Sequence, residues 1–161
     1  MGEDLLKKAI TAAYRHLARS PRSRNEVERR LREKNYPEPI IRQVIQRLEE
    51  YRYLDDQAFA KQWARDRMAH RRWGPLRLRI ELQRKGIAKE WIEEALRELF
   101  GEKEEEARAA ELIALRLKRC GLRDPREYRR CSDYLFRRGY SPDVIQAVLR
   151  RFKKDADLPV D

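Results

Sequence analysis

This sequence is poor in cysteine and histidine, from which many catalytic and metal sites are built. It contains two cysteines, Cys120 and Cys131, and two histidines, His16 and His70, and none of them has the spacing of a metal-ligand set. No glycine-rich phosphate loop, paired-histidine metal motif or nucleophile elbow occurs. We therefore expect neither an enzyme nor a bound cofactor or metal. The cysteines are interpreted as buried thiols in a reducing compartment.

The sequence also lacks any apolar run of about 18 residues, which is the length that a membrane-spanning helix needs. Its first residues, MGEDLLKK, place acids before a short apolar stretch, whereas a secretory signal begins with basic residues. Leu6 stands where a myristoylation motif has Ser or Thr. We expect a cytoplasmic protein that has no membrane partner.

Charged residues are abundant instead. They make up 42% of the chain, and 39 Lys and Arg against 28 Asp and Glu leave a net charge of +11. Such a balance favours an anionic partner, most often nucleic acid, although net charge also serves solubility. The apolar residues, 41% of the chain, suffice for a modest core, so the chain as a whole is not expected to be disordered.

One pattern of residue types recurs in three segments of the sequence. Leu31 to Leu48, Leu82 to Leu99 and Leu135 to Phe152 each show an apolar residue, then a tight-turn residue, then a helical apolar stripe. The turn position is filled by Asn35, Gly86 and Gly139. Tandem repeats bury their apolar faces against their neighbours, so we expect function on a repetitive surface rather than in one pocket.

The segments between the sparse glycines and prolines follow a 3.6-residue hydrophobic period, which predicts an all-α protein. Each repeat is expected to hold three helices, stacked in an elongated monomer. The predicted repeats are residues 1–53, 54–101 and 102–154, followed by a frayed tail at 155–161. The predicted helices are 3–19, 24–34, 37–50, 56–71, 75–85, 89–100, 103–120, 125–138 and 142–154.

Several helix ends carry local signals. Ser23 and Glu26 fit a capping box, in which each side chain accepts the other residue's backbone N–H. Gly74-Pro75 places a proline at a helix start, where its missing N–H costs nothing. Asp124-Pro125 and Ser141-Pro142 each offer an N-cap followed by such a proline.

Basic residues gather near one predicted corner between two helices. Residues 61–85 hold nine basic and two acidic residues, whereas residues 86–114 hold four basic and nine acidic ones. The corner itself, Trp73-Gly74-Pro75, is flanked by Arg71, Arg72, Arg77 and Arg79. Guanidinium groups from two helices can converge there on one anion. The plain alternative is a soluble helix face that is laced with ion pairs.

A further pattern runs through the middle repeat. The stretch YLDDQAFA at 53–60 is followed by Trp63, an arginine-rich segment, the WGP corner at 73–75, Glu81-Leu82 and the triplet KGI at 85–87. This pattern resembles the signature of the RecX family, and the flanking three-helix repeats extend the resemblance across nearly the whole chain. Asn35 departs from the glycine of the other two turns.

That resemblance implies a curved array of three-helix repeats and a cytoplasmic bacterial regulator. It implies binding to the filament of the RecA recombinase, inhibition of its ATPase and strand-exchange activities, and a role in recombination, DNA repair and the SOS response. It also implies binding to single- and double-stranded DNA without sequence specificity. Within the basic segment, the candidate contacts to RecA or DNA are Arg65, Arg67, Arg71, Arg72, Trp73, Arg77, Arg84 and Lys85.

Two other functions stay open. One is a nucleic-acid-binding helical module that acts alone, with its helix pairs as helix-turn-helix readers. The mixed or acidic composition of residues 37–50 and 90–99 disfavours that reading, because such a helix suits a major groove poorly. The other is a structural adaptor that makes no DNA contact.

Overall fold

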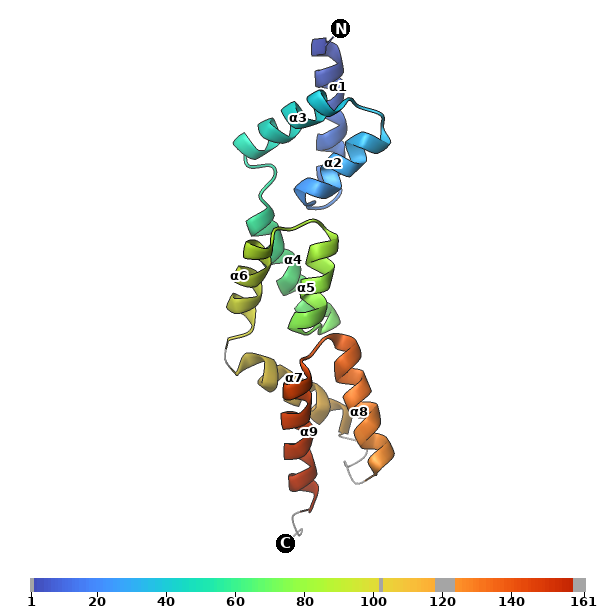
Figure 1. Cartoon of the computed structure of the whole chain (residues 1–161), viewed down its shortest axis with the longest axis vertical. Coiled ribbons are helices and arrows are strands. Elements are labelled where there is room, and N and C mark those ends of the chain that lie inside the picture. The colour runs from blue at the N-terminus through green and yellow to red at the C-terminus, as the bar shows by residue number, and fades with distance from the viewer. Residues whose placement is uncertain (1, 102, 118–123, 158–161) are drawn as a thin grey trace. The chain divides into compact units, whose positions relative to one another are not determined.

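The computed structural model describes residues 2–101, 103–117 and 124–157. These residues form nine helices and no strand (Figure 1). The helices are α1 (Gly2–Leu17), α2 (Arg24–Glu33), α3 (Glu38–Glu50), α4 (Asp56–Arg71), α5 (Pro75–Arg84), α6 (Lys89–Leu99), α7 (Glu104–Leu117), α8 (Pro125–Arg138) and α9 (Pro142–Asp157). The prediction of an all-α chain built from three-helix repeats is confirmed.

Most of the predicted helix ends are correct to within two residues. The main difference is α9, which continues to Asp157, three residues beyond its predicted end and into the predicted frayed tail. The reason is that no glycine or proline interrupts the chain there before Pro159. The predicted end of α7 at 118–120, including Cys120, lies outside the described residues.

The predicted caps and turns form as the sequence indicates. The Ser23 hydroxyl accepts the Glu26 N–H at 3.2 Å, and the Glu26 carboxylate accepts the Ser23 N–H at 2.9 Å. Asp124 caps α8 by accepting the Arg126 N–H at 2.9 Å. The three turn residues are all left-handed, with φ values of 60° at Asn35, 74° at Gly86 and 85° at Gly139. Asparagine tolerates this conformation better than most residues, so it can replace the turn glycine.

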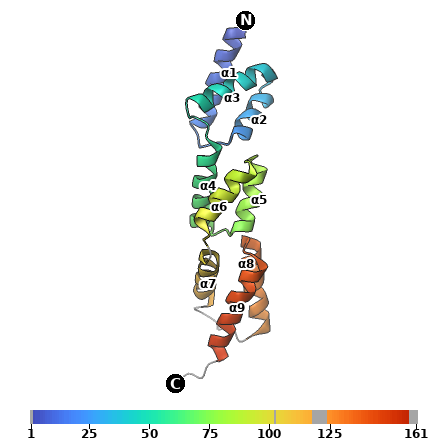
Figure 2. The same cartoon turned by 60° about the vertical axis from the view of Figure 1, so that its left-hand side comes forward.

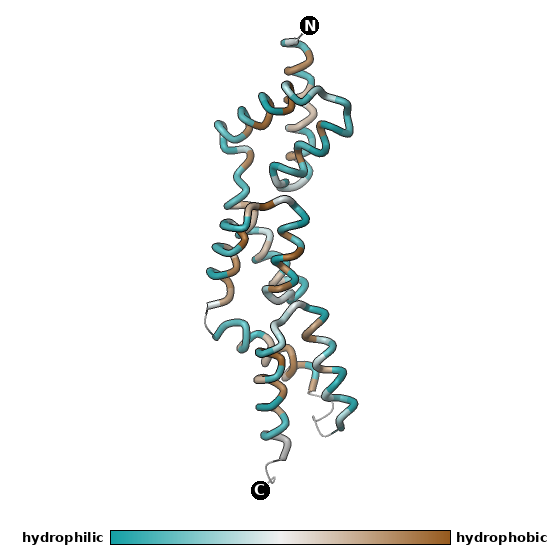
Figure 3. The backbone as a smooth tube through the Cα atoms, viewed as in Figure 1, coloured by the Kyte–Doolittle hydropathy of each residue, from teal (hydrophilic) through white to brown (hydrophobic). Residues whose placement is uncertain are grey.

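The chain divides into two compact units, Met1–Trp63 with Glu81–Ala95 and Ala64–Ile80 with Leu96–Asp161. Helices α4, α5 and α6 therefore belong partly to each unit. In the first unit α1, α2 and α3 pack pairwise, and in the second α7 and α8 pack against α9 (Figures 1 and 2). The apolar stretches of these helices alternate with hydrophilic ones along the chain (Figure 3), as expected for helices that bury one face.

The repeated apolar positions form the two cores. The first core contains Ala9, Ala13, Val27, Leu31, Ile41, Val44, Ile45, Leu48 and Leu54. The second contains Ala109, Leu112, Ile113, Cys131, Leu135, Tyr140, Ile145, Val148 and Leu149. In the middle repeat the equivalent residues Leu82, Ile92 and Ala95 are also buried. The apolar stripe found by comparing the repeats is thus the buried face of each one.

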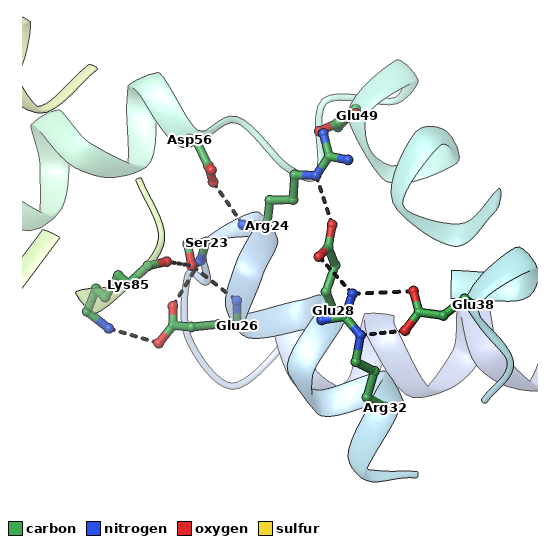
Figure 4. Close-up of polar contacts among 9 residues, drawn as sticks. All are labelled: Ser23, Arg24, Glu26, Glu28, Arg32, Glu38, Glu49, Asp56 and Lys85. Atoms are coloured by element: carbon green, nitrogen blue, oxygen red, sulfur yellow. Dashed lines mark hydrogen bonds and ion pairs between the residues drawn. The ribbon is translucent and has the colours of Figure 1, made fainter. Parts of the chain in front are cut away.

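Repeat 1 meets the α5–α6 turn through a polar junction inside the first unit (Figure 4). The Ser23 hydroxyl donates to the carbonyl oxygen of Lys85 at 2.7 Å, and the Lys85 ammonium donates to the Glu26 carboxylate at 2.8 Å. The backbone N–H of Arg24 donates to the Asp56 carboxylate at 2.8 Å. Side-chain atoms of Asn25 lie where a Cβ on Gly86 would stand, which requires glycine at that turn.

An equivalent junction lies inside the second unit. The N–H of Gly74, the residue just before α5, donates to the carbonyl oxygen of Arg138 at 2.6 Å. In the first junction, Ser23 and Lys85 occupy the positions that Gly74 and Arg138 occupy here. Ser23 immediately precedes α2, and Lys85 immediately precedes the turn residue Gly86. The Leu76 N–H donates to the Gly139 carbonyl at 2.9 Å. This second junction brings the α4–α5 corner against the end of α8.

Candidate functional site

The α4–α5 corner is held by hydrogen bonds to its backbone. Arg72 adopts a left-handed φ of 56° just after α4, which turns the chain toward α5. The Arg138 guanidinium donates to the Arg71 carbonyl, and the Tyr140 hydroxyl donates to the Arg72 carbonyl at 3.5 Å. The Arg77 guanidinium donates to the Arg137 carbonyl at 2.9 Å. The corner is therefore anchored to α8 and the turn that follows it.

A basic hollow of about 400 Å³ opens beside this corner. It is lined by His70, Arg71, Trp73, Arg77, Tyr134, Arg137 and Arg138, and we call it the corner hollow. No carboxylate lines it. Arg71 and Arg137 are exposed, and neither forms an ion pair with a carboxylate of the described residues. These two guanidinium groups are available to an external anion.

Aromatic rings position the other cations of the corner hollow. The Arg77 guanidinium carbon lies 4.4 Å from the ring centroid of Trp73, and that of Arg138 lies 4.6 Å from the ring of Tyr134. Stacking on a ring face holds a guanidinium in place while leaving its N–H groups at the edge. Such an arrangement binds phosphate or carboxylate through charge-assisted, bidentate hydrogen bonds.

Three of the eight predicted site residues, Arg71, Trp73 and Arg77, meet in the corner hollow. Arg67 joins them indirectly, because its guanidinium lies 5.9 Å from the Trp73 ring. The other two predicted residues of the second unit lie elsewhere. Arg72 lines a separate hollow of about 200 Å³, and Arg65 pairs with Glu98 at 3.6 Å.

The remaining two predicted residues belong to the first unit. Arg84 pairs with Glu81 on its own helix at 3.1 Å. Lys85 binds Glu26, and its ammonium lies 5.5 Å from the ring of Trp63. Lys85 is half-buried and takes part in the junction with repeat 1.

The sequence-based prediction missed the members of the corner hollow that come from α8, namely Tyr134, Arg137 and Arg138, and also His70. One signal for Arg138 was present, because the repeat alignment equates it with Lys85. His70 lies four residues after Asp66 on α4, and its ring contacts the Asp66 carbonyl oxygen at 2.8 Å. No local pattern indicates that α8 approaches the corner, since the hydrogen bonds between them join residues 67 and 68 positions apart.

Cys131 is buried, as predicted, and its thiol donates to the Glu127 carboxylate at 4.0 Å. Among residues 2–101, 103–117 and 124–157, no cluster of histidine, cysteine and carboxylate side chains is suited to holding a metal ion. In the same part of the chain, every helix is too short or too polar to cross a bilayer.

Comparison with known proteins agrees with the fold. Family models described as the first, second and third three-helix domains of RecX match residues 9–48, 55–96 and 104–149. A regulatory protein RecX of Streptomyces coelicolor is 33% identical over 92% of this chain and 79% of its own length. One from a Mycobacterium species is 36% identical over 89% of this chain and 80% of its own length. The chain belongs to the RecX family.

Other RecX proteins differ in length. The regulatory protein RecX of Geobacillus kaustophilus is 36% identical over 91% of this chain, but the chain spans only 54% of that protein. The crystal structure of RecX from Lactobacillus salivarius matches with a TM-score of 0.83 at 24% identity, covering 94% of this chain and 99% of that one. A second RecX crystal structure matches with a TM-score of 0.76 over 91% of this chain and 72% of its own. RecX relatives thus share its fold and are named as regulatory proteins.

Proposed function

We propose that this RecX family member binds the RecA recombinase in its filament on DNA and inhibits the ATPase and strand-exchange activities of RecA. The observation that carries the proposal is the corner hollow, because four of its lining residues, His70, Arg71, Trp73 and Arg77, lie in the segment with the RecX signature. Its unpaired guanidinium groups suit the carboxylates of a protein partner or the phosphates inside a filament. The chain would act as a regulator and not as an enzyme.

The proposal extends to the setting of this function. We place the protein in the cytoplasm as a monomer that acts in recombination and DNA repair, on single- and double-stranded DNA without sequence specificity. We also retain the division into repeats at 1–53, 54–101 and 102–154, within which each three-helix domain match falls. An array of repeats suits a filament, because its contact surface grows along one dimension.

The decisive experiment measures RecA-catalysed ATP hydrolysis and strand exchange while this protein is titrated. The test variant is Arg71→Glu with Arg137→Glu, since both side chains line the corner hollow without an ion pair. The control is Arg129→Glu with Arg150→Glu, which changes the charge equally at exposed positions of the same unit. Arg77 is left unchanged because it anchors the corner to Arg137.

We expect the test variant to need at least tenfold more protein for half-inhibition, which corresponds to about 1.4 kcal/mol of binding free energy. The control should inhibit as the parent does, and both should melt at the parent's temperature. Equal loss in the two variants would point to net charge rather than to the corner hollow. A parent protein that leaves both RecA activities unchanged would contradict the function itself.

The second candidate is a helical module that binds nucleic acid alone. It is favoured by the net charge of +11 together with a hollow that contains no carboxylate. The same titrations, run beside a measurement of DNA binding without RecA, separate it from the first, because DNA binding without any effect on RecA would support the module.

A further inference from the structure

A second basic hollow lies on the first repeat, far in sequence from the RecX signature. Its volume is about 570 Å³, and it forms between α1 and the residues of α2 and the α2–α3 turn. The cations that line it are Lys7, Lys8, Arg15, Arg19, Arg30 and Lys34. No carboxylate lines it. We call it the first-repeat hollow.

Its cations differ from those on the other face of α2 in how they are paired. On that face Arg24 binds Glu28 and Glu49, and Arg32 binds Glu38 (Figure 4). In the hollow, Arg30 pairs with Glu33 at 3.0 Å. The other five cations form no ion pair with a carboxylate of the described residues. A helix face that only provides solubility would resemble the paired face.

The spacing of the cations along α1 indicates an extended ligand. Lys7, Thr11 and Arg15 lie four residues apart on one side of the helix, and all three line the hollow. At 1.5 Å per residue, Lys7 and Arg15 are separated by about 12 Å along the axis. One strand of nucleic acid carries a negative charge about every 3.4 Å of helix axis. The row therefore spans about 3.5 phosphate spacings, which corresponds to about four to five successive phosphates, whereas a single free phosphate would reach only part of it.

The scarcity of apolar side chains argues against a protein partner. Among the lining residues, Ala12 and the ring of Tyr36 offer the main apolar contact, whereas protein interfaces bury a largely apolar centre. Contacts to the sugar and phosphates of nucleic acid need no such centre. We propose that the first-repeat hollow binds the sugar–phosphate backbone of DNA. The inference rests on the DNA-binding part of the proposed function and assigns that part to a surface of its own.

His16 provides a reporter inside this hollow. Burial lowers the pKa of His16, and the guanidinium groups of Arg22 and Arg30 lower it further, against a smaller opposing effect of Glu26. A bound polyanion would favour the protonated imidazole and raise that pKa. The only other histidine, His70, lines the corner hollow. The two rings therefore report separately on the two hollows.

The first experiment measures binding of labelled oligo(dT) over a range of salt concentrations, without RecA. The test variant is Lys8→Gln with Arg15→Gln, and the control is Arg42→Gln with Arg47→Gln, which are exposed on α3 outside the hollow. Each phosphate contact in a single strand contributes about 0.7 to the slope of log K against log salt. Because the test variant removes two such contacts, the magnitude of its slope should fall by about 1.4, whereas the slope of the control should not change. Unchanged melting temperatures show that both variants fold.

The second experiment follows the histidine ring resonances by NMR as oligo(dT) is added. The pKa of His16 should rise on binding in the parent, and the rise should disappear in the test variant. A response at His70 with none at His16 would restrict DNA to the corner hollow and overturn the inference. The inference would also be overturned by a test variant that keeps the parental slope for oligo(dT) but no longer inhibits RecA, since that result would assign the first-repeat hollow to contact with RecA.

Failure of the two proposals can be told apart. A parent that has no effect on RecA, combined with the expected loss of slope in the Lys8 and Arg15 variant, would remove the RecA function and leave the DNA site standing. A parent that inhibits RecA, combined with a Lys8 and Arg15 variant that keeps its full salt slope, would remove the DNA site and leave the RecA function standing.

Discussion

At the scale of single residues, both glycines of the second junction are required by close packing, Gly74 against Gly139 and Gly139 against Arg77. A Cβ on Gly74 would lie 2.5 Å from the carbonyl oxygen of Gly139. A Cβ on Gly139 would lie 2.4 Å from the Cβ of Arg77, and the positive φ of Gly139 disfavours a side chain in any case. Backbone therefore contacts backbone at this point, and no larger residue fits at Gly74 without displacing the α8–α9 turn.

Gly74→Ala should lower the free energy of unfolding by about 1–3 kcal/mol, the usual cost of forcing extra atoms into a packed site. Gly101→Ala is the matched control, because a Cβ there meets nothing within 4 Å. Its effect should stay within about 0.5 kcal/mol. Urea unfolding of both variants measures the difference. If Gly74→Ala were as stable as the parent, the close contact with Gly139 would not exist in solution.

The sequence revealed the conformation of these glycines but not their contacts. Gly139 was predicted as a tight-turn residue and Gly74 as the residue before a helix-starting proline, since both signals are local. Their proximity depends on how one repeat docks on the next, which no local pattern encodes. For the same reason the sequence listed Arg65 beside Arg71 among the candidate contacts, although the structure pairs Arg65 with Glu98 and leaves Arg71 open in the corner hollow.

At the scale of helices, prediction succeeded where periodicity and caps are strong. α4 and α8 begin and end at their predicted residues, and Ser23 caps α2 as expected. The junctions between repeats were not predicted, because they join the beginning of one helix to the end of another far along the chain. The first junction is polar and buried, so it makes stability depend on pH.

Glu26 and Asp56 act on that dependence in opposite directions. Burial favours the neutral form of Glu26, but hydrogen bonds from the Lys85 ammonium and the Ser23 N–H outweigh it and lower the pKa of Glu26 below 4.5. Its stabilising effect is thus present above the unfolded-state pKa and is lost as pH falls through the lower folded-state pKa. Burial raises the pKa of Asp56, so its contribution is present in acid and is lost as pH rises through its folded-state pKa.

Glu26→Gln should therefore reduce the loss of unfolding free energy between about pH 6 and pH 3. Asp56→Asn keeps a carbonyl oxygen for the Arg24 N–H but removes the opposing titration, so it should make that loss steeper. Denaturant unfolding at a series of pH values measures both changes. Parallel curves for Glu26→Gln and the parent would show that the Glu26–Lys85 pair does not contribute to folding.

At the scale of the whole molecule, the net charge of +11 is not spread evenly. Each compact unit carries one hollow that is lined by cations without a carboxylate. The sequence indicated the α4–α5 side of the corner hollow, because Arg71 and Arg77 are close together along the chain and coincide with the RecX signature, but it did not indicate Arg137 and Arg138, which α8 contributes. It did not indicate the first-repeat hollow, whose cations are scattered over two helices and a turn and are gathered only by the packing of α1 against α2.

This distribution leads to a prediction for the proposed binding of DNA by the chain. Cations that contact phosphates release counterions, so affinity should fall steeply with salt, by about 10³-fold or more between about 50 and 200 mM if six or more phosphates are contacted. Phosphates carry no sequence information, so mixed-sequence and homopolymeric strands of equal length should bind with similar affinity at each salt concentration. Fluorescence anisotropy with single-stranded and duplex probes tests both expectations. Tight binding that resists salt, or strong preference for one sequence, would instead indicate base reading by a recognition helix and would favour the helix-turn-helix alternative.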